Sequence, residues 1–290
     1  MKSKVEKLEL QPAKKKIRIL VAVEVLIFVL VAGLNLAPFV WGALTSLKTE
    51  RDVMAYPPKL FGSVISFEHY KEVFHGTFFT GMLNSIWYSI VCIIVGLFFG
   101  LLAAYAMKRF RFRGKKAFFI IILSCIPLSS GGAAMVVPNY TLLSSLGMTN
   151  QWYTLPLIYM AYHLPITIWI LMGGLEAVPV EIDEAAKIDG AGRWYIIFRL
   201  VMPLSVPAMA SAALFIFLGA WNEFVVSSVL VSSQALYPLQ VSIYNYMGFY
   251  GIHWGPLTAA ATAAVIPTLI VFAFLGKALV SGLTAGSVKD

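Results

Sequence analysis

The apolar stretches of this chain constrain its fold most, because several of them approach the length that a lipid bilayer requires. A transmembrane helix takes about 20 predominantly apolar residues. Of the 290 residues, 59% are hydrophobic and only 12% are charged, which is unusual for a soluble domain. We therefore expect an all-α membrane protein with six transmembrane helices. The predicted spans are Ile19–Leu44, Met82–Met107, Ala117–Val137, Thr154–Leu175, Pro207–Leu230 and Leu257–Val280.

The predicted organisation is a single membrane domain between two short tails. Residues 1–18 form a basic N-terminal tail, residues 19–280 the six-helix domain and residues 281–290 a polar C-terminal tail. The first apolar stretch is too long for a cleavable signal peptide, and no small-residue cleavage site follows it. We interpret this stretch as a retained membrane anchor.

The basic residues are distributed unequally between the two sides of the predicted spans. Eighteen of the 22 lie in the N-terminal tail, in the link after the second span, in the loop after the fourth span and near the C-terminus. The other four share the opposite side with four acidic residues. Because Lys and Arg accumulate in cytoplasmic loops, both termini and the loop after the fourth span are predicted to be cytoplasmic. The net charge of +8 then reflects topology and contact with anionic lipid, and no nucleic-acid partner is expected.

The loop at residues 176–206, between the fourth and fifth spans, is polar and able to form a helix. Pro179 suits a first helical turn, and three acidic residues follow it near the positive end of the helix dipole. Gly190 can adopt the left-handed conformation that ends a helix. The small side chains of Ala185 and Ala186 would let another protein approach closely. This loop is therefore predicted to be a docking element.

The same loop carries a specific pattern: Glu184-Ala185-Ala186, three residues, Gly190, nine residues and then Leu-x-x-Pro. This pattern resembles the EAA loop of the membrane subunits of ABC importers. Three further segments, in matching order, resemble the carbohydrate branch of that family and its smaller, maltose-type permease subunit. They are Ala104–Gly114, Trp221–Phe224 and Gly282–Lys289. The resemblance implies the type I ABC importer transmembrane domain and a position in the bacterial cytoplasmic (inner) membrane.

The resemblance also implies roles for the residues of the loop. It would form the coupling helix, which sits in a cleft of a cytoplasmic ATPase. Glu184 is then the charged contact, Ala185 and Ala186 allow close approach, Asp189 stabilises the turn and Gly190 ends the helix. The chain contains no G-x-x-x-x-G-K-[ST] phosphate loop. ATP and Mg²⁺ are therefore expected in a partner ATPase, and neither a catalytic residue nor a cofactor is expected in this chain.

The implied partners are a second permease subunit, two copies of the ABC ATPase, an extracytoplasmic solute-binding protein and membrane lipid. A heterodimer of permeases is expected, with a homodimer left open. The implied substrate is a sugar or oligosaccharide, and a non-sugar solute such as a polyol phosphate is the alternative. A secondary transporter would need internal repeats and ion sites on broken helices, and a membrane enzyme would need converging catalytic groups. The sequence shows neither.

Polar and aromatic residues in the predicted spans and in the loop after the fifth span are candidates for the substrate path. For the set at residues 221–223, within the fifth span, an interface with a partner subunit is the alternative. Ionisable and polar groups inside a membrane are costly and often functional, and aromatic rings can stack on sugars. The candidates are Asn84, Trp221, Asn222, Glu223, Tyr244, Asn245 and Tyr246. The last three lie in an aromatic outer loop, which serves either as a sugar contact or as an interfacial aromatic belt. The sequence leaves both interpretations open.

No metal site is predicted. Cys92 and Cys125 lie in different predicted spans, and the four histidines lack the spacing of metal ligands. We interpret His163, in the fourth span, as a neutral imidazole bonded to a neighbouring helix. The outer segment at residues 48–81 is predicted to be either an amphipathic helix on the membrane surface or a partly ordered loop.

Overall fold

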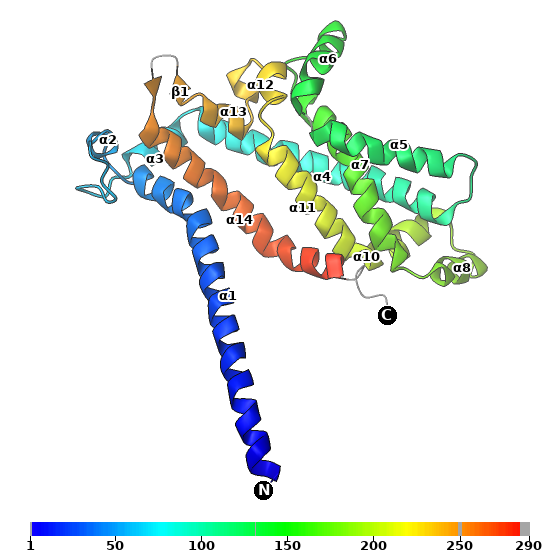
Figure 1. Ribbon diagram of the computed structural model, residues 1–290. Coiled ribbons are helices and arrows are strands. Elements are labelled where there is room, and N and C mark those ends of the chain that lie inside the picture. The colour runs from blue at the N-terminus through cyan, green and yellow to red at the C-terminus, as the bar shows by residue number, and fades with distance from the viewer. Residues whose placement is uncertain (1, 131, 249–250, 285–290) are drawn as a thin grey trace.

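The computed structural model describes residues 2–130, 132–248 and 251–284, and it is built almost entirely of helices (Figure 1). Within these residues, four helical segments are long and apolar enough to cross a membrane. They are Leu20–Ser46, Thr77–Arg109, Thr154–Glu176 and Trp254–Gly276. These segments belong to α1 (Lys2–Ser46), α4 (Thr77–Arg109), α7 (Thr154–Glu176) and α14 (Trp254–Thr284). The predicted multi-pass helical fold is confirmed, with each of these four segments near its predicted place.

A fifth candidate span is a pair of helical segments with a sharp bend between them. The chain turns by 80° between Arg193–Leu204 and Val206–Asn222. Pro203 and Pro207 flank the bend, and their rings remove backbone donors and prevent a regular helix there. The elements on the two sides are α9 (Arg193–Tyr195), the π-helix η1 (Ile196–Val201), α10 (Met202–Leu204) and α11 (Val206–Asn222).

The prediction that the fifth span continues to Leu230 is wrong. Helix α11 ends at Asn222, and Glu223 has extended backbone angles of φ −72° and ψ 125°. The Glu223 carboxylate accepts the backbone N–H groups of Val226 at 2.7 Å and Ser227 at 3.0 Å. These two bonds satisfy backbone donors at the start of a separate short helix, α12 (Ser227–Leu230). An apolar run long enough for a span is thus divided by one capping carboxylate.

The predicted third span, residues 117–137, is shared between α5 (Lys115–Ser130) and α6 (Gly132–Ser145). Residue 131, between them, lies outside the described residues. The two helices have 16 and 14 residues, so each is shorter than the length that a span usually takes. Figure 1 shows α5 lying along α7 and α6 extending away from it.

Helices α4, α7 and α11 pack closely because small residues lie where they meet. A Cβ atom added at Gly174 of α7 would lie 2.2 Å from the Cβ of Ala208 on α11, and one at Gly100 of α4 would lie 2.7 Å from Thr167 Cγ2 on α7. Small residues let helix backbones approach inside a membrane, where van der Waals packing drives association. These three helices form the framework on which both ends of the molecule are built.

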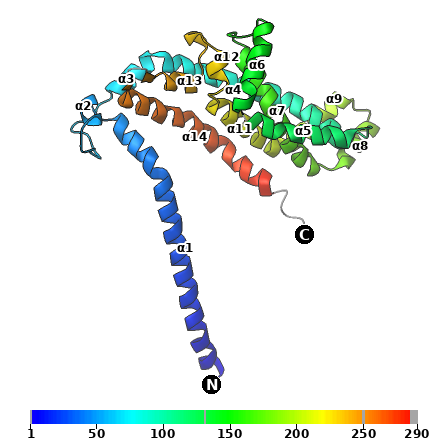
Figure 2. The same cartoon turned by 45° about the horizontal axis from the view of Figure 1, so that its top comes forward.

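Helix α1 projects from this framework (Figure 2). The most apolar stretch of α1 has no buried residue in this chain. The C-terminal end of α1 approaches α14. The helix begins at Lys2 and includes the predicted basic tail, so its 45 residues extend about 68 Å. The side chains of residues 2–19 are not described.

The end of the molecule opposite the loop after α7 is made of short elements. They are α2 (Glu50–Val53), α3 (Glu68–His75), the 3-10 helix η2 (Gln234–Leu236), α13 (Leu239–Tyr244) and the two-stranded antiparallel pair β1 (Met247–Gly248) and β2 (Gly251–Ile252). Residues 48–81 contain both irregular chain and a short helix, α3, and the place of this helix on a membrane surface stays a prediction. Its Val73 is fully buried against α4 and α14 residues.

Candidate coupling helix and outer polar residues

The loop after α7 forms one short helix, α8 (Val180–Ile188), with a defined end. Gly190 has φ +82°, a left-handed conformation that favours glycine. Its N–H donates to Lys187 O at 3.1 Å, and the Ala191 N–H donates to Ala186 O at 2.9 Å. This pair of bonds is the Schellman motif of helix C-termini. The prediction that Gly190 ends the helix is confirmed.

Helix α8 has one face against the bundle and one face in the open. Asp183 and Ala186 are buried, and Ala186 packs in the cluster formed by α4, α7 and η1. Glu184, Ala185 and Ile188 are exposed, with Ile188 at 86%. The close approach expected at both alanines is therefore available at Ala185, whereas Ala186 faces its own bundle.

A buried ion pair holds α8 on the end of α4. Asp183 Oδ2 accepts hydrogen bonds from Tyr105 Oη at 2.9 Å and Arg109 Nε at 3.1 Å. The Arg109 and Asp183 side chains are 8% and 1% exposed. A further Arg109 nitrogen donates to Val178 O at 2.8 Å, just before α8. One guanidinium thus binds both the helix and the chain that leads into it.

Sequence reasoning missed this group. It used Asp183 only as an acidic residue near the start of the helix and Tyr105 only as part of a family pattern. Arg109 served that pattern and the distribution of basic residues. A signal was present, because residues 105 and 109 are four apart and share one face of a helix. Asp183, the partner of Arg109, is 74 residues away in sequence, and no local pattern in the sequence indicates that the two residues meet.

Aromatic side chains hold the segment that follows α8. The rings of Trp194 and Phe198 stack with centroids 5.8 Å apart, and Phe198 stacks on Phe98 of α4 at 5.9 Å. These contacts pack the segment on α4. Asp189 is exposed at the end of α8, and its proposed stabilisation of the turn stays a prediction. Of the predicted C-terminal tail, residues 285–290 lie outside the described part of the chain.

The outer candidate residues lie at the opposite end of the bundle, and several have structural partners. The Asn84 side chain donates to Ala235 O at 2.9 Å and Tyr237 O at 3.0 Å, which ties α4 to the outer loop. Trp221 is 1% exposed and stacks on Phe217 at 5.3 Å. Both residues therefore support the framework.

Glu223 has a complete set of partners. In addition to the two backbone N–H groups that open α12, its carboxylate accepts the Tyr159 hydroxyl at 3.0 Å. Three donors around one carboxylate fix its position. The sequence placed Glu223 inside a span, whereas the structure places it at the junction of α11, α12 and α7.

Asn222 and two residues of the aromatic outer loop, Tyr244 and Asn245, are exposed. The Asn222 side chain is exposed, and its amide donates to Leu218 O at 2.8 Å. Tyr244 is 52% exposed and packs its ring against Phe224 at 4.9 Å. Asn245 is exposed and Tyr246 is half-buried. Contact between these residues and a substrate stays a prediction.

Within the described residues, no group of three or more His, Cys, Asp and Glu side chains is placed to hold a metal ion. His163 lies against Gly219 of α11, where an added Cβ would be 2.1 Å from the ring. This glycine provides the space that the imidazole occupies.

The chain is thus a multi-pass helical membrane protein with a short loop helix fastened to the end of its bundle. It belongs to the family described as the binding-protein-dependent transport system inner membrane component, whose model matches residues 96–284. The predicted identification as an ABC importer permease is confirmed, and the chain is a transport subunit.

Two curated relatives match most of the chain. It is 32% identical over 253 residues to the diacetylchitobiose uptake system permease protein DasC of Streptomyces coelicolor, covering 87% of this chain and 91% of that protein. It is 32% identical over 267 residues to the trehalose/maltose transport system permease protein MalG of Thermococcus litoralis, covering 90% and 94%.

Two solved structures share the fold. A chain of a bacterial ABC transporter involved in import of the acidic polysaccharide alginate superposes with a TM-score of 0.78 at 23% identity, covering 90% of this chain and 96% of that one. A chain of the alginate transporter in complex with an alginate pentasaccharide-bound periplasmic protein gives 0.62 at 18% identity, covering 90% and 94%.

Proposed function

We propose that this chain is the permease subunit of an importer that moves a sugar or oligosaccharide into the bacterial cytoplasm. The family assignment supports the transport role, and relatives named for diacetylchitobiose and for trehalose/maltose support a carbohydrate substrate. The structural observation that supports the mechanism is the position of α8. This helix has one solvent-exposed face and is joined to α4 by a buried ion pair.

In this proposal α8 is the coupling helix. Glu184 and Ala185 form the contact with a cytoplasmic ATPase, while Asp189 and Gly190 shape the end of the helix. Because Asp183 is bonded to Tyr105 and Arg109, a displacement of α8 must displace the end of α4 as well. ATP and Mg²⁺ bind in a pair of ATPase copies, whose closure turns the spans between two packed arrangements.

The proposed topology has six spans with both termini in the cytoplasm. Helices α1, α4, α7 and α14 supply four spans, the bent segment through α11 supplies another, and α5 supplies the short third crossing. The basic residues at the α8 end of the bundle support this orientation. The membrane is the bacterial cytoplasmic (inner) membrane, in line with the family description.

A second permease subunit completes the proposed complex. The exposed apolar surface of α1 and the exposed faces of the bundle are available to lipid and to that subunit. An extracytoplasmic solute-binding protein would deliver the substrate to the end that carries Asn222, Tyr244 and Asn245. The fixed residues Asn84, Trp221 and Glu223 then maintain the frame of the path.

Co-purification and uptake test the proposal. The full chain, expressed with its neighbouring transport genes, should co-purify with an ATPase and a second permease. Reconstituted in liposomes, the complex should take up a radiolabelled oligosaccharide only with ATP and the solute-binding protein. Isolation without an ATPase, or uptake that persists without ATP, would contradict the proposal.

A further inference from the structure

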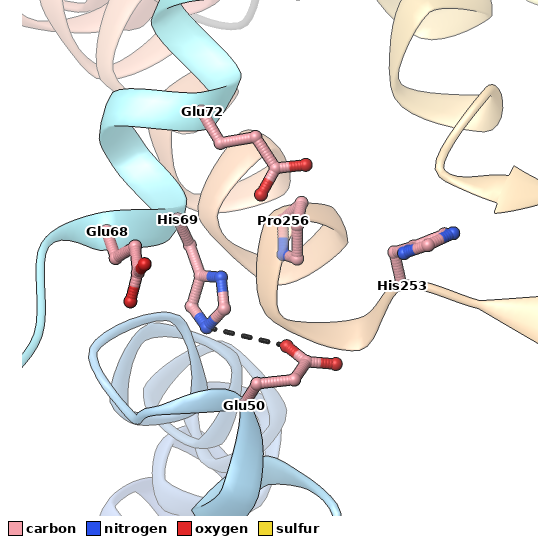
Figure 3. A pocket seen from close by; sticks show the side chains of 6 residues that line it. All are labelled: Glu50, Glu68, His69, Glu72, His253 and Pro256. Atoms are coloured by element: carbon pink, nitrogen blue, oxygen red, sulfur yellow. Dashed lines mark ion pairs between the residues drawn. The ribbon is translucent and has the colours of Figure 1, made fainter.

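An acidic pocket opens at the end of the molecule opposite α8. It has a volume of about 330 Å³ and lies where α2, α3 and the start of α14 meet (Figure 3). Its lining consists of Glu50, Glu68, His69, Glu72, His253 and Pro256. Three carboxylates and two imidazoles therefore surround one opening, and neither Lys nor Arg lines it.

His69 is the buried member of this pocket. Its side chain is 6% exposed, and Nε2 lacks a hydrogen-bond partner within the described part of the chain. This nitrogen lies 3.8 Å from Glu50 Oε2, too far for a hydrogen bond. A Cβ atom at Gly255 of α14 would lie 2.3 Å from His69 Cε1. The absence of a side chain at Gly255 thus leaves room for an imidazole whose Nε2 has no hydrogen-bond partner within the described residues.

Two lysines of the segment around α2 are engaged with other groups. Lys59 pairs with Asp52 at 3.6 Å, and Lys48 Nζ donates to Lys59 O at 2.7 Å while lying over the Trp41 ring. Among the described ion pairs, Glu50 has only His69 as a partner, and Glu68 and Glu72 have none. Among the described residues, therefore, no Lys or Arg forms an ion pair with the three carboxylates of the pocket.

We propose that this pocket receives a cationic side chain, best matched by an arginine, from the extracytoplasmic solute-binding protein. The inference rests on the proposed function, which places this end of the bundle outside the cell. Carboxylate oxygens are acceptors, and a neutral imidazole offers one acceptor nitrogen, whereas a guanidinium has five N–H donors in a planar fork. Such a group can bond to His69 and Glu50 together, although these two are too far apart to bond to each other.

The test uses the assembled transporter in liposomes and the solute-binding protein that belongs to it. The measured quantity is the binding-protein concentration that gives half-maximal stimulation of ATP hydrolysis. In the double variant Glu50→Gln with Glu72→Gln, this concentration should rise about tenfold at low salt, with an unchanged maximal rate. The difference should shrink at high ionic strength, because exposed charges are screened. His75→Gln is the matched control, since His75 lies on α3 and is bonded to Lys71 O outside the pocket.

Gly255→Ala tests the pocket without changing any charge. The added methyl must displace the His69 ring, so the half-maximal concentration should rise by about threefold, less than in the double variant because both carboxylates remain. A wild-type concentration in both variants, with assembly and hydrolysis intact, would overturn the pocket assignment alone. Dependence on a divalent metal, shown by adding a chelator on the outer side, would also overturn it. Absence of stimulation in the wild-type transporter would instead contradict the proposed function.

Discussion

The carboxylates that lie near the two ends of α4 have opposite surroundings. At the α8 end, Asp183 is buried and bonded to Arg109 and Tyr105. At the other end, Glu50 and Glu72 border an open pocket that neither Lys nor Arg lines. A buried carboxylate needs a partner inside its own chain, because an unpaired buried charge is costly. The comparison teaches that the α8 end is closed by contacts within the chain, whereas the opposite end leaves carboxylates without a Lys or Arg partner among the described residues. In the proposed function, the first end transmits motion and the second meets another protein.

Breaking the inner ion pair should have the largest effect. Arg109→Met would leave Asp183 buried without its cation, which costs about 3–5 kcal/mol in stability. Thermal unfolding of the purified subunit would measure the loss, and uptake per ATP hydrolysed would measure coupling.

Lys108→Met is the matched control, because Lys108 is the preceding residue and pairs with Glu176, whose side chain is 66% exposed. An exposed pair contributes about 0–1 kcal/mol. Equal losses in the two variants would show that the buried pair has no special role.

The end of α8 gives the second test of the inner region. Gly190→Pro should uncouple hydrolysis from uptake while membrane insertion continues, because proline fixes φ near −65° and Gly190 has φ +82°. Gly190→Ala should be milder, at about 1–2 kcal/mol, since an added Cβ meets no atom within 4 Å.

Gly192→Ala serves as the control for both glycine variants. Its φ is −71°, and an added Cβ there also meets no atom within 4 Å. Wild-type coupling by Gly190→Pro would count against the assignment of α8.

Two neighbouring residues sharpen the account of the outer end. Asn222→Ala should raise the apparent KM for uptake several-fold while stability stays near wild type, because the Asn222 side chain is exposed. Glu223→Gln should instead lower stability by about 1–2 kcal/mol, because its carboxylate accepts three donors.

Uptake kinetics and thermal unfolding of both variants would separate these effects. Unchanged KM and maximal rate in both variants would remove this region from the substrate path.

The smallest expected effect concerns Asp52, whose carboxylate accepts hydrogen bonds from Ser63. Hydrogen bonds from the Ser63 backbone and side chain lower the pKa of Asp52 from 3.8 to about 2. Because the folded pKa is depressed, the stabilisation is fully present above about pH 4 and is lost as the pH falls through about 2.

Limited proteolysis should therefore find the loop at residues 50–63 equally protected between pH 8 and pH 5, and less protected at pH 7 in Asp52→Asn. Equal protection of this variant and the wild type would contradict the role of the carboxylate.

The sequence was sufficient where a signal was local. Apolar length located α4, α7, α14 and the membrane part of α1, and Gly190 marked the end of α8. It failed where a distant partner decided the outcome. Helix α11 ends at residue 222 because the Glu223 side chain accepts backbone N–H groups at the start of α12. The hydrophobic pattern of the sequence gives no sign of these bonds.

The same limit applied to the two ends of α4. Asp183 and Arg109 are far apart in sequence, and the outer pocket joins α3 to α14 across most of the chain. Hydrophobic periodicity reports which segments enter the membrane, but it contains no information about which polar groups meet at their ends.

Cross-linking from α8 tests the central claim most directly. Cysteine placed at exposed Ala185 should form a cross-link to the ATPase that changes with nucleotide, whereas cysteine at Ala186, which is 8% exposed and faces the bundle, should form little. Capture of the ATPase from position 185 and not from position 186 is the predicted result. Failure of position 185 to capture it in an assembled, active transporter would contradict the account.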